Sequence, residues 1–301
     1  MLHCKKTIYR KVSPFIDFIN PSTKFSVNRP TFAATKEFPP ISRTHHATRG
    51  TITPNRLFAT KDSGSDSDKS AFLSDSSCIN LAQAPPDFDS RCVLVVPEVI
   101  SKVESSILVR EIETCLDKQR YQKGHWDSVI IGYKEAEVFD NVVEEDKQRF
   151  KCRVDAVSIV ERLRGQLYST CFSKSKFSKW LPCHAIDLKE DGKLTAHVDS
   201  ERFSGAIVAG LSLLSPSIMR LRPSRPSATT ELNEKTDSKH YIDMYLPPDS
   251  LYILRGMARY DYSHELLPSG SIFHNEILGT SHTVRRGRRI SVIFRDAKIE
   301  S

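Results

Sequence analysis

A succession of short, strand-like segments in the C-terminal half of the chain limits its fold more than any other feature. Apolar and β-branched residues occur there in runs of four to eight, separated by Pro, Gly, Ser and Asp. Many short strands with turn residues between them are typical of an antiparallel sandwich or jelly roll. We predict a turn at Asp191-Gly192 and strands at residues 183–188, 194–199, 207–214, 218–221, 241–246, 251–254, 259–264 and 288–295.

Two amphipathic segments precede these strands. Residues 101–118 have the helical period, with Ser101 as a possible N-cap, and we place Val103, Ile107, Ile112 and Leu116 on their apolar face. Residues 155–172 have the same period, and short strands are expected at 92–96 and 128–133. The predicted fold is therefore mainly β, a double-stranded β-helix or jelly roll with two helices packed on one face.

The N-terminal third differs in composition. Residues 1–61 contain eleven Lys and Arg against two acids, as is typical of a transit peptide for mitochondria, although an ordinary disordered basic tail has a similar composition. Residues 62–90 are rich in Ser, Asp, Gly and Pro and bury too little apolar surface to order. We therefore predict a leader at 1–61, a flexible linker at 62–90 and one domain at 91–298.

The charge is also divided unequally. The net charge of residues 1–61 is +9 and that of the whole chain is +7, so residues 62–301 have a net charge of about −2. A nearly neutral domain lacks the basic field that drives non-specific phosphate binding. The seven cysteines are dispersed without a C-x-x-C pair, which excludes a zinc ribbon and favours a reducing compartment. No apolar run is long enough for a membrane span.

Three histidine and carboxylate positions can make a metal site. In a strand, residues two apart lie on one face about 6.6 Å apart, so His197 and Asp199 present an imidazole and a carboxylate side by side. His264 follows in a separate segment. Two imidazoles and one carboxylate form the facial triad of non-haem iron sites. By itself, a His-x-Asp is more often a surface polar pair.

The last strand carries two cations on one face. Alternation over residues 289–295 places Arg289, Ser291, Ile293 and Arg295 together and leaves Ile290, Val292 and Phe294 on the other face. Two arginines on an otherwise apolar strand are costly to bury without an anion. They either meet such an anion or reach solvent and pair with acids.

These elements together resemble the iron(II)/2-oxoglutarate dioxygenases and, within them, the AlkB family. The family pattern of H-x-D, a distal His and R-x-x-x-x-x-R matches His197/Asp199, His264 and Arg289/Arg295. The stretches HVDSERFSGAIVAGLSLLSPSIMRL, PPDSLYILRGMARYDYSHE and RRGRRISVIFR are similar to a mitochondrial branch of the family, as is His125-Trp126-Asp127. The resemblance covers about residues 91–296 and is strongest over 181–296.

The resemblance implies iron(II) held by His197, Asp199 and His264, with 2-oxoglutarate and O2 as cosubstrates. Arg289 would bind the distal carboxylate of 2-oxoglutarate, since a guanidinium binds carboxylates bidentately. Tyr252 would donate its hydroxyl to the cosubstrate unless it is only a sheet aromatic, and Arg295 would complete the pocket. Decarboxylation to succinate would then be coupled to insertion of oxygen into a C–H bond.

Several positions depart from the nucleic-acid-repairing members. Ile186 and Leu188 stand where those enzymes have N-x-Y, and Ser291 and Ile293 stand where they have Asn and Thr. The sequence before residue 181 shows no aromatic and basic hairpin of the kind that holds a flipped base. These departures leave iron and 2-oxoglutarate binding intact and argue against a DNA substrate.

We therefore expect a monomeric mitochondrial matrix dioxygenase that oxidises a protein side chain. Two alternatives remain open: demethylation of mitochondrial RNA, and a non-catalytic regulator that binds metal and 2-oxoglutarate. The resemblance also implies a role in fatty-acid metabolism or regulated necrosis.

Overall fold

The computed structural model describes residues 71–124, 129–139, 151–173, 175–202, 204–224 and 239–299, together with the short strand β1 (Phe18–Ile19). Apart from that strand, the predicted leader lies outside the described residues, and so do residues 62–70 of the predicted linker. The His125-Trp126-Asp127 motif also lies outside them. In the described part, no helix is both long and apolar enough to cross a membrane.

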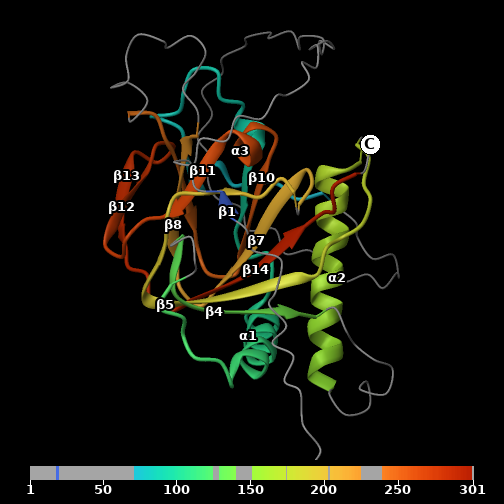
Figure 1. Cartoon of the computed structure of the whole chain (residues 1–301). Coiled ribbons are helices and arrows are strands. Elements are labelled where there is room, and N and C mark those ends of the chain that lie inside the picture. Colours follow the sequence, from blue (N-terminus) through green and yellow to red (C-terminus); the bar gives the residue numbers. More distant parts are fainter. Residues whose placement is uncertain are drawn as a thin grey trace, which may run out of the picture. The chain divides into compact units, whose positions relative to one another are not determined.

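A six-stranded antiparallel sheet forms one layer of the fold (Figure 1). Strands that are far apart in the sequence are neighbours in this sheet, so both ends of the domain contribute to it. In spatial order, the strands are β3 (Val93–Val96), β10 (Ser250–Arg255), β7 (Ile207–Leu213), β14 (Arg289–Arg295), β5 (Cys183–Leu194) and β4 (Ile130–Val138).

A second antiparallel sheet contributes the facing layer. Its order is β11 (Tyr262–Leu266), β8 (Ser217–Pro223), β9 (Ile242–Leu246) and β2 (Ile79–Asn80). Two smaller pairs complete the strands, namely β12 (Ser271–Asn275) with β13 (Thr280–Val284), and β1 with β6 (Val198–Asp199). This arrangement confirms the predicted jelly roll.

Two helices cover the outer face of the larger sheet. Helix α1 (Lys102–Leu116) begins at Ser101, whose hydroxyl and the Glu104 carboxylate form a capping box. Helix α2 (Lys151–Cys171) contributes Leu163 and Leu167 to the same core. The predicted apolar face of α1 was partly wrong, because Val103 is 70% exposed and the buried residues are Leu108, Ile112 and Leu116.

The six-stranded sheet therefore separates two apolar cores. The alternate residues Leu211, Leu213, Ile290 and Val292 face the helices. On the opposite face, Leu188, Tyr252 and Leu254 pack against Met219 and Met244 of the smaller sheet. The functional pocket lies on this second side, between the sheets.

The predicted turn at Asp191-Gly192 was wrong, because β5 continues through it from Cys183 to Leu194. Its pairing with β4 shifts register between Ile131 and Tyr133. There the backbones of Gly192 and Gly132 approach so closely that a Cβ on Gly132 would lie 3.2 Å from the Gly192 Cα. The glycines mark a β-bulge instead of a hairpin.

Two further strand predictions need correction. The predicted strand at 194–199 is reduced to β6, with His197 joined to His264 only by an isolated bridge. The predicted strand at 259–264 begins only at Tyr262, because Met257–Tyr260 forms the short helix α3 after Gly256 turns the chain at a φ of 52°. Tyr260 therefore does not share a strand face with His264.

Residues 71–90 belong to the folded unit, so the predicted linker differs from the structure over this range. Strand β2 pairs with β9, and Phe72 and Cys78 are buried in the two cores. The short 3-10 helices η1 (Ser76–Cys78) and η2 (Ser90–Cys92) connect this segment to β3. Phe72 and Cys78 therefore tie this mostly polar segment to the domain, whereas Leu73 is exposed.

Candidate metal centre and buried arginine pocket

His197, Asp199 and His264 converge at the end of the space between the sheets. All three are buried, and their ligand atoms lie within 4.8 Å of one another. The backbone N–H of each histidine donates to the carbonyl of the other, at 3.2 Å and 2.8 Å, and the two rings lie 4.2 Å apart between centroids. One backbone bridge therefore brings together ligands that are 67 residues apart in the sequence.

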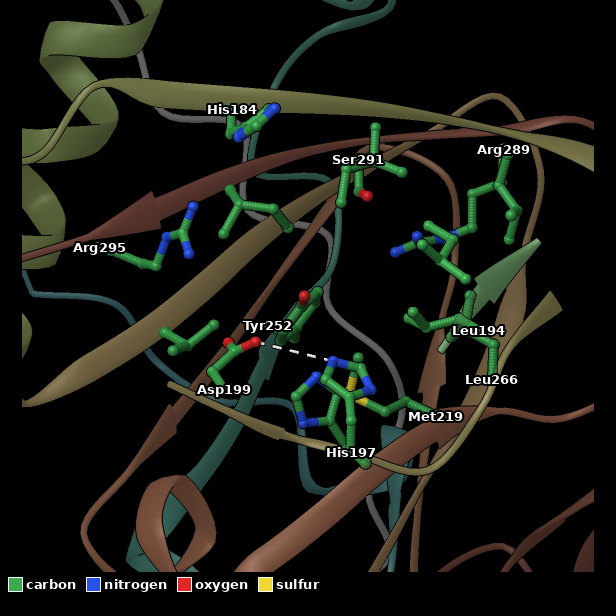
Figure 2. Close-up of a pocket in the computed structure, with 16 residues that line it drawn as sticks. His184, Leu194, His197, Asp199, Met219, Tyr252, Leu266, Arg289, Ser291 and Arg295 are labelled. Atoms are coloured by element: carbon green, nitrogen blue, oxygen red, sulfur yellow. Dashed lines mark ion pairs between the residues drawn. The ribbon is translucent and has the colours of Figure 1, made fainter. Parts of the chain in front are cut away.

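Hydrogen bonding and burial prepare these side chains as ligands. The Nδ1 of His197 lies 2.8 Å from the carbonyl of Thr195, so Nδ1–H can donate there and leave the Nε2 lone pair for a cation. That Nε2 lies 3.6 Å from the Asp199 carboxylate (Figure 2). Burial, followed by the nearby His197, lowers the pKa of His264 to about 3. Its imidazole is therefore neutral at physiological pH, as metal ligation requires.

Asp199 is kept ionised. Burial alone would raise its pKa, but the hydrogen bond to His197 and the charges of His264, His197 and Arg295 outweigh burial and lower the pKa. The site thus offers two imidazole nitrogens and one carboxylate oxygen. This donor set fits a divalent first-row metal such as iron(II).

A pocket extends from this triad between the two sheets and has a volume of about 620 Å³ including the solvent at its mouth. Most of its wall is apolar, from residues of β4, β5, β7, β8, β11 and β14. The polar lining comes from the triad, Tyr252, His184 of β5 and residues of β14, with Arg289 and Arg295 on opposite sides of Tyr252 (Figure 2). The predicted shared face of β14 is confirmed and turns inward, because Arg289, Ser291, Ile293 and Arg295 all line the pocket.

Arg289 is a buried cation that lacks an anionic partner within the described residues. It is 3% exposed, and its Nη2 donates to the Ser212 hydroxyl at 2.7 Å. The Nε atoms of Arg289 and Arg295 are both buried without an acceptor. Burial lowers the pKa of Arg289 to about 10, so it remains charged. The unfilled donors of a buried guanidinium fit the carboxylate of a small diacid.

Tyr252 lines the same pocket as the triad and Arg289. Its ring packs over Gly210 on β7, where any Cβ would overlap the tyrosine ring and hydroxyl. Burial raises the pKa of Tyr252 to about 12, so the hydroxyl keeps its proton and can donate it to a bound ligand.

Sequence reasoning missed one polar residue of the pocket wall and one residue that supports the wall. The supporting residue is Ser212, which accepts a hydrogen bond from Arg289. The wall residue is His184. His184 is 2% exposed, and its Nε2 lies 3.5 Å from the Glu135 carboxylate on β4. Burial, then the charge of Arg295, lowers the pKa of His184 to about 4. Alternation along residues 183–188 would have placed His184 on the pocket face with Ile186 and Leu188, but the identity of that face depended on the fold.

The comparison with protein families agrees with this site. Residues 121–295 match the model described as the 2OG-Fe(II) oxygenase superfamily. This chain therefore belongs to the 2OG-Fe(II) oxygenase superfamily and is a dioxygenase. Membership implies iron(II), 2-oxoglutarate and O2, and the His–Asp–His triad is compatible with iron.

Within the superfamily, the chain is similar to AlkB-type proteins. It is 38% identical over 203 residues to the mouse protein named "Alpha-ketoglutarate-dependent dioxygenase alkB homolog 7, mitochondrial", a match that covers 67% of this chain and 77% of the mouse protein. The bovine protein of the same name is 38% identical over 202 residues, with the same coverage.

Solved structures are more distant. A prolyl-4-hydroxylase from Pseudomonas putida has 9% identity and a TM-score of 0.40, over 70% of this chain and 95% of that chain. The jelly-roll assignment therefore rests on the two antiparallel sheets of this chain.

Proposed function

We propose that this protein is a mitochondrial matrix dioxygenase that oxidises a C–H bond of a protein side chain. His197, Asp199 and His264 hold iron(II), and Arg289, Tyr252 and Arg295 hold 2-oxoglutarate. The observation that carries the proposal is a buried His–Asp–His triad joined by one pocket to a buried arginine whose Nε has no acceptor. A role in fatty-acid metabolism or regulated necrosis belongs to the same proposal and rests on the family resemblance alone.

The metal would supply O2 activation, with 2-oxoglutarate decarboxylated to succinate and CO2. The chain's own residues have simpler tasks. Arg289 neutralises the distal carboxylate, and Tyr252, which lines the same pocket, donates a hydrogen bond to the cosubstrate. The apolar wall keeps water away from these contacts, which strengthens them.

A carboxylate next to the pocket favours a protein over a nucleic acid. Glu135 on β4 does not line the pocket itself, but its carboxylate lies 3.5 Å from the Nε2 of the lining residue His184. A carboxylate repels phosphate and attracts a cationic side chain. Residues 62–301 also lack the positive charge that nucleic-acid binding uses. A basic side chain presented by a partner protein is therefore the substrate class that we favour.

Turnover tests the enzymatic proposal. Full-length protein with iron(II) and carboxyl-labelled 2-oxoglutarate should release labelled CO2, and a candidate substrate should stimulate the release. The His197→Ala, Asp199→Ala double variant removes two of three ligands and should reduce release to background. Equal release by wild type and the double variant would refute the enzymatic proposal.

Salt dependence separates the protein substrate from the RNA alternative. We expect a Lys- and Arg-containing peptide to bind wild type and to bind Glu135→Gln several-fold more weakly. Single-stranded RNA should bind weakly to both. RNA that binds tightly, with a steep decrease in affinity as salt rises, would favour the demethylase instead.

Mitochondrial targeting rests on the basic, acid-poor residues 1–61 and on the printed names of the mouse and bovine relatives. Fusion of residues 1–61 to a fluorescent reporter should direct it to the mitochondrial matrix. A diffuse cytosolic signal would remove this part of the proposal.

A further inference from the structure

A buried arginine outside the predicted site donates hydrogen bonds to the chain at the aspartate ligand and just after it. Arg259 lies on α3 and is 2% exposed. Its Nη1 donates to the carbonyl of Asp199 at 2.9 Å, and its Nη2 donates to the carbonyl of Ser200 at 3.2 Å and to the Ser204 hydroxyl at 2.6 Å. Three acceptors of one loop therefore converge on a single guanidinium.

The position of Arg259 in the chain gives this contact its significance. Helix α3 lies between β10 and β11, and Arg259 precedes His264 by five residues. Arg259 thus joins two segments by hydrogen bonds: the one that leads into the ligand His264, and the one that follows the ligand Asp199. The backbone bridge between His197 and His264 is the other tie. Together they fix the backbone on both sides of the Asp199 carboxylate.

The far end of the same loop is also held. The Tyr260 hydroxyl donates to the carbonyl of Gly205 at 3.0 Å. The Asp296 carboxylate accepts from the N–H groups of Ala206 and Ile207, each at 2.9 Å. Arg259 is the member of this set that contacts the ligand residue itself.

We propose that Arg259 is a positioning residue that holds Asp199 in ligating geometry before the metal binds. This inference rests on the proposed metal site. The charge of Arg259 cannot explain a benefit to metal binding, because a cation close to the triad repels a divalent metal. Its contribution must therefore come from the fixed fork of its donors, which a lysine does not reproduce.

The charge of Arg259 should weaken metal binding, whereas its hydrogen bonds should strengthen it, so metal affinity tells the two effects apart. Mn(II) is used as the probe, and its affinity for the full-length protein is measured by electron paramagnetic resonance in the absence of 2-oxoglutarate. Arg259→Met should weaken Mn(II) binding about 10–100-fold, as is typical when a partner of a metal ligand is removed. Arg259→Lys keeps the charge and should fall between wild type and Arg259→Met.

The chain offers a matched control and a milder variant. Arg255 also donates to distant backbone carbonyls, those of Arg91 and Thr170, but not to the metal loop. Arg255→Lys should therefore bind Mn(II) as wild type does. Ser204→Ala removes one acceptor and leaves Arg259 in place, so it should weaken Mn(II) binding by a few-fold.

Thermal unfolding in a chelator separates positioning from general stability. A positioning role predicts that Arg259→Lys and Ser204→Ala unfold close to the wild-type temperature without metal and are stabilised less by added Mn(II). Wild-type or tighter Mn(II) binding by Arg259→Met and Ser204→Ala would overturn the inference. If Arg259→Met does not fold, wild-type Mn(II) affinity in both Arg259→Lys and Ser204→Ala overturns it. If the wild-type protein binds Mn(II) no better than the His197→Ala, Asp199→Ala double variant does, the proposed metal site itself is refuted.

Discussion

The two ends of the pocket are built on different kinds of support. The arginine end lies on β10, β7 and β14, which are interior strands of the six-stranded sheet with neighbours on both sides. The metal end lies on β6, which has two residues, and on β11, which is an edge strand of the smaller sheet. Ladder hydrogen bonds fix the first end, whereas the second depends on individual ties such as the His197–His264 bridge and Arg259.

This contrast suggests that the two ends can be disabled separately. A strand held on both sides keeps its shape when one side chain changes, because the ladder does not depend on that side chain. A two-residue strand such as β6 has too few ladder hydrogen bonds to keep its shape in this way. The following predictions test this difference, from the largest expected effect to the smallest.

Arg289→Met should abolish most 2-oxoglutarate binding and leave the metal end intact. Loss of a buried cation that faces a carboxylate costs about 2–5 kcal/mol, so the KM for 2-oxoglutarate should rise roughly 30-fold or more. Mn(II) affinity should stay at the wild-type value. Without 2-oxoglutarate the variant should unfold at the same or a higher temperature, because an unpaired buried charge has been removed.

Arg289→Lys is the control for charge. It keeps the cation without the fork and should retain part of the 2-oxoglutarate affinity. An unchanged KM in Arg289→Met would place the distal carboxylate elsewhere. Parallel loss of Mn(II) binding would show that the two ends are coupled.

Gly210→Ala should disturb the interior sheet itself. The added Cβ overlaps the Tyr252 ring, and overpacking of this kind costs about 1–3 kcal/mol. We expect a lower melting temperature and a higher KM for 2-oxoglutarate, because Tyr252 is displaced from the pocket. Gly165→Ala on α2 is the matched control. No atom lies within 4 Å of its new Cβ, so it should stabilise the protein by up to about 1 kcal/mol.

His184 should make stability depend on pH. Its pKa falls from 6.5 in the unfolded chain to about 4 in the folded protein, so the unfolded state binds the proton first as the pH decreases. The stabilisation is complete above pH 6.5 and is lost as the pH falls towards 4. Between pH 7 and pH 5, the wild type should lose about 2 kcal/mol more unfolding free energy than His184→Gln.

Urea unfolding of the metal-free proteins at these two pH values measures that difference. Identical losses in the wild type and the variant would show that the buried imidazole is protonated as easily as in the unfolded chain.

Much of the site could be predicted because its residues follow strand alternation. His197 with Asp199, and Arg289 with Ser291 and Arg295, each lie two or more strand positions apart on one face, and the structure places them in one pocket. Local patterns failed where tertiary contacts decided the backbone. Asp191-Gly192 has the composition of a turn but lies where two strands approach closely, and the helix that follows Gly256 takes up the first residues of the strand predicted at 259–264.

Three things were predictable from the sequence by itself. Spacing along a strand predicted the His197–Asp199 pair and the shared face of the arginines, and the run of short strands predicted the jelly-roll class. His264 was added as the third ligand by resemblance to the family pattern. Only the tertiary structure decided which ties hold those residues. The contact between Arg259 and Asp199 joins residues 60 positions apart, and residues 71–90 join the domain where β2 pairs with β9. Such contacts leave no periodic trace in the sequence, since they depend on which distant backbone groups the fold brings within hydrogen-bonding distance.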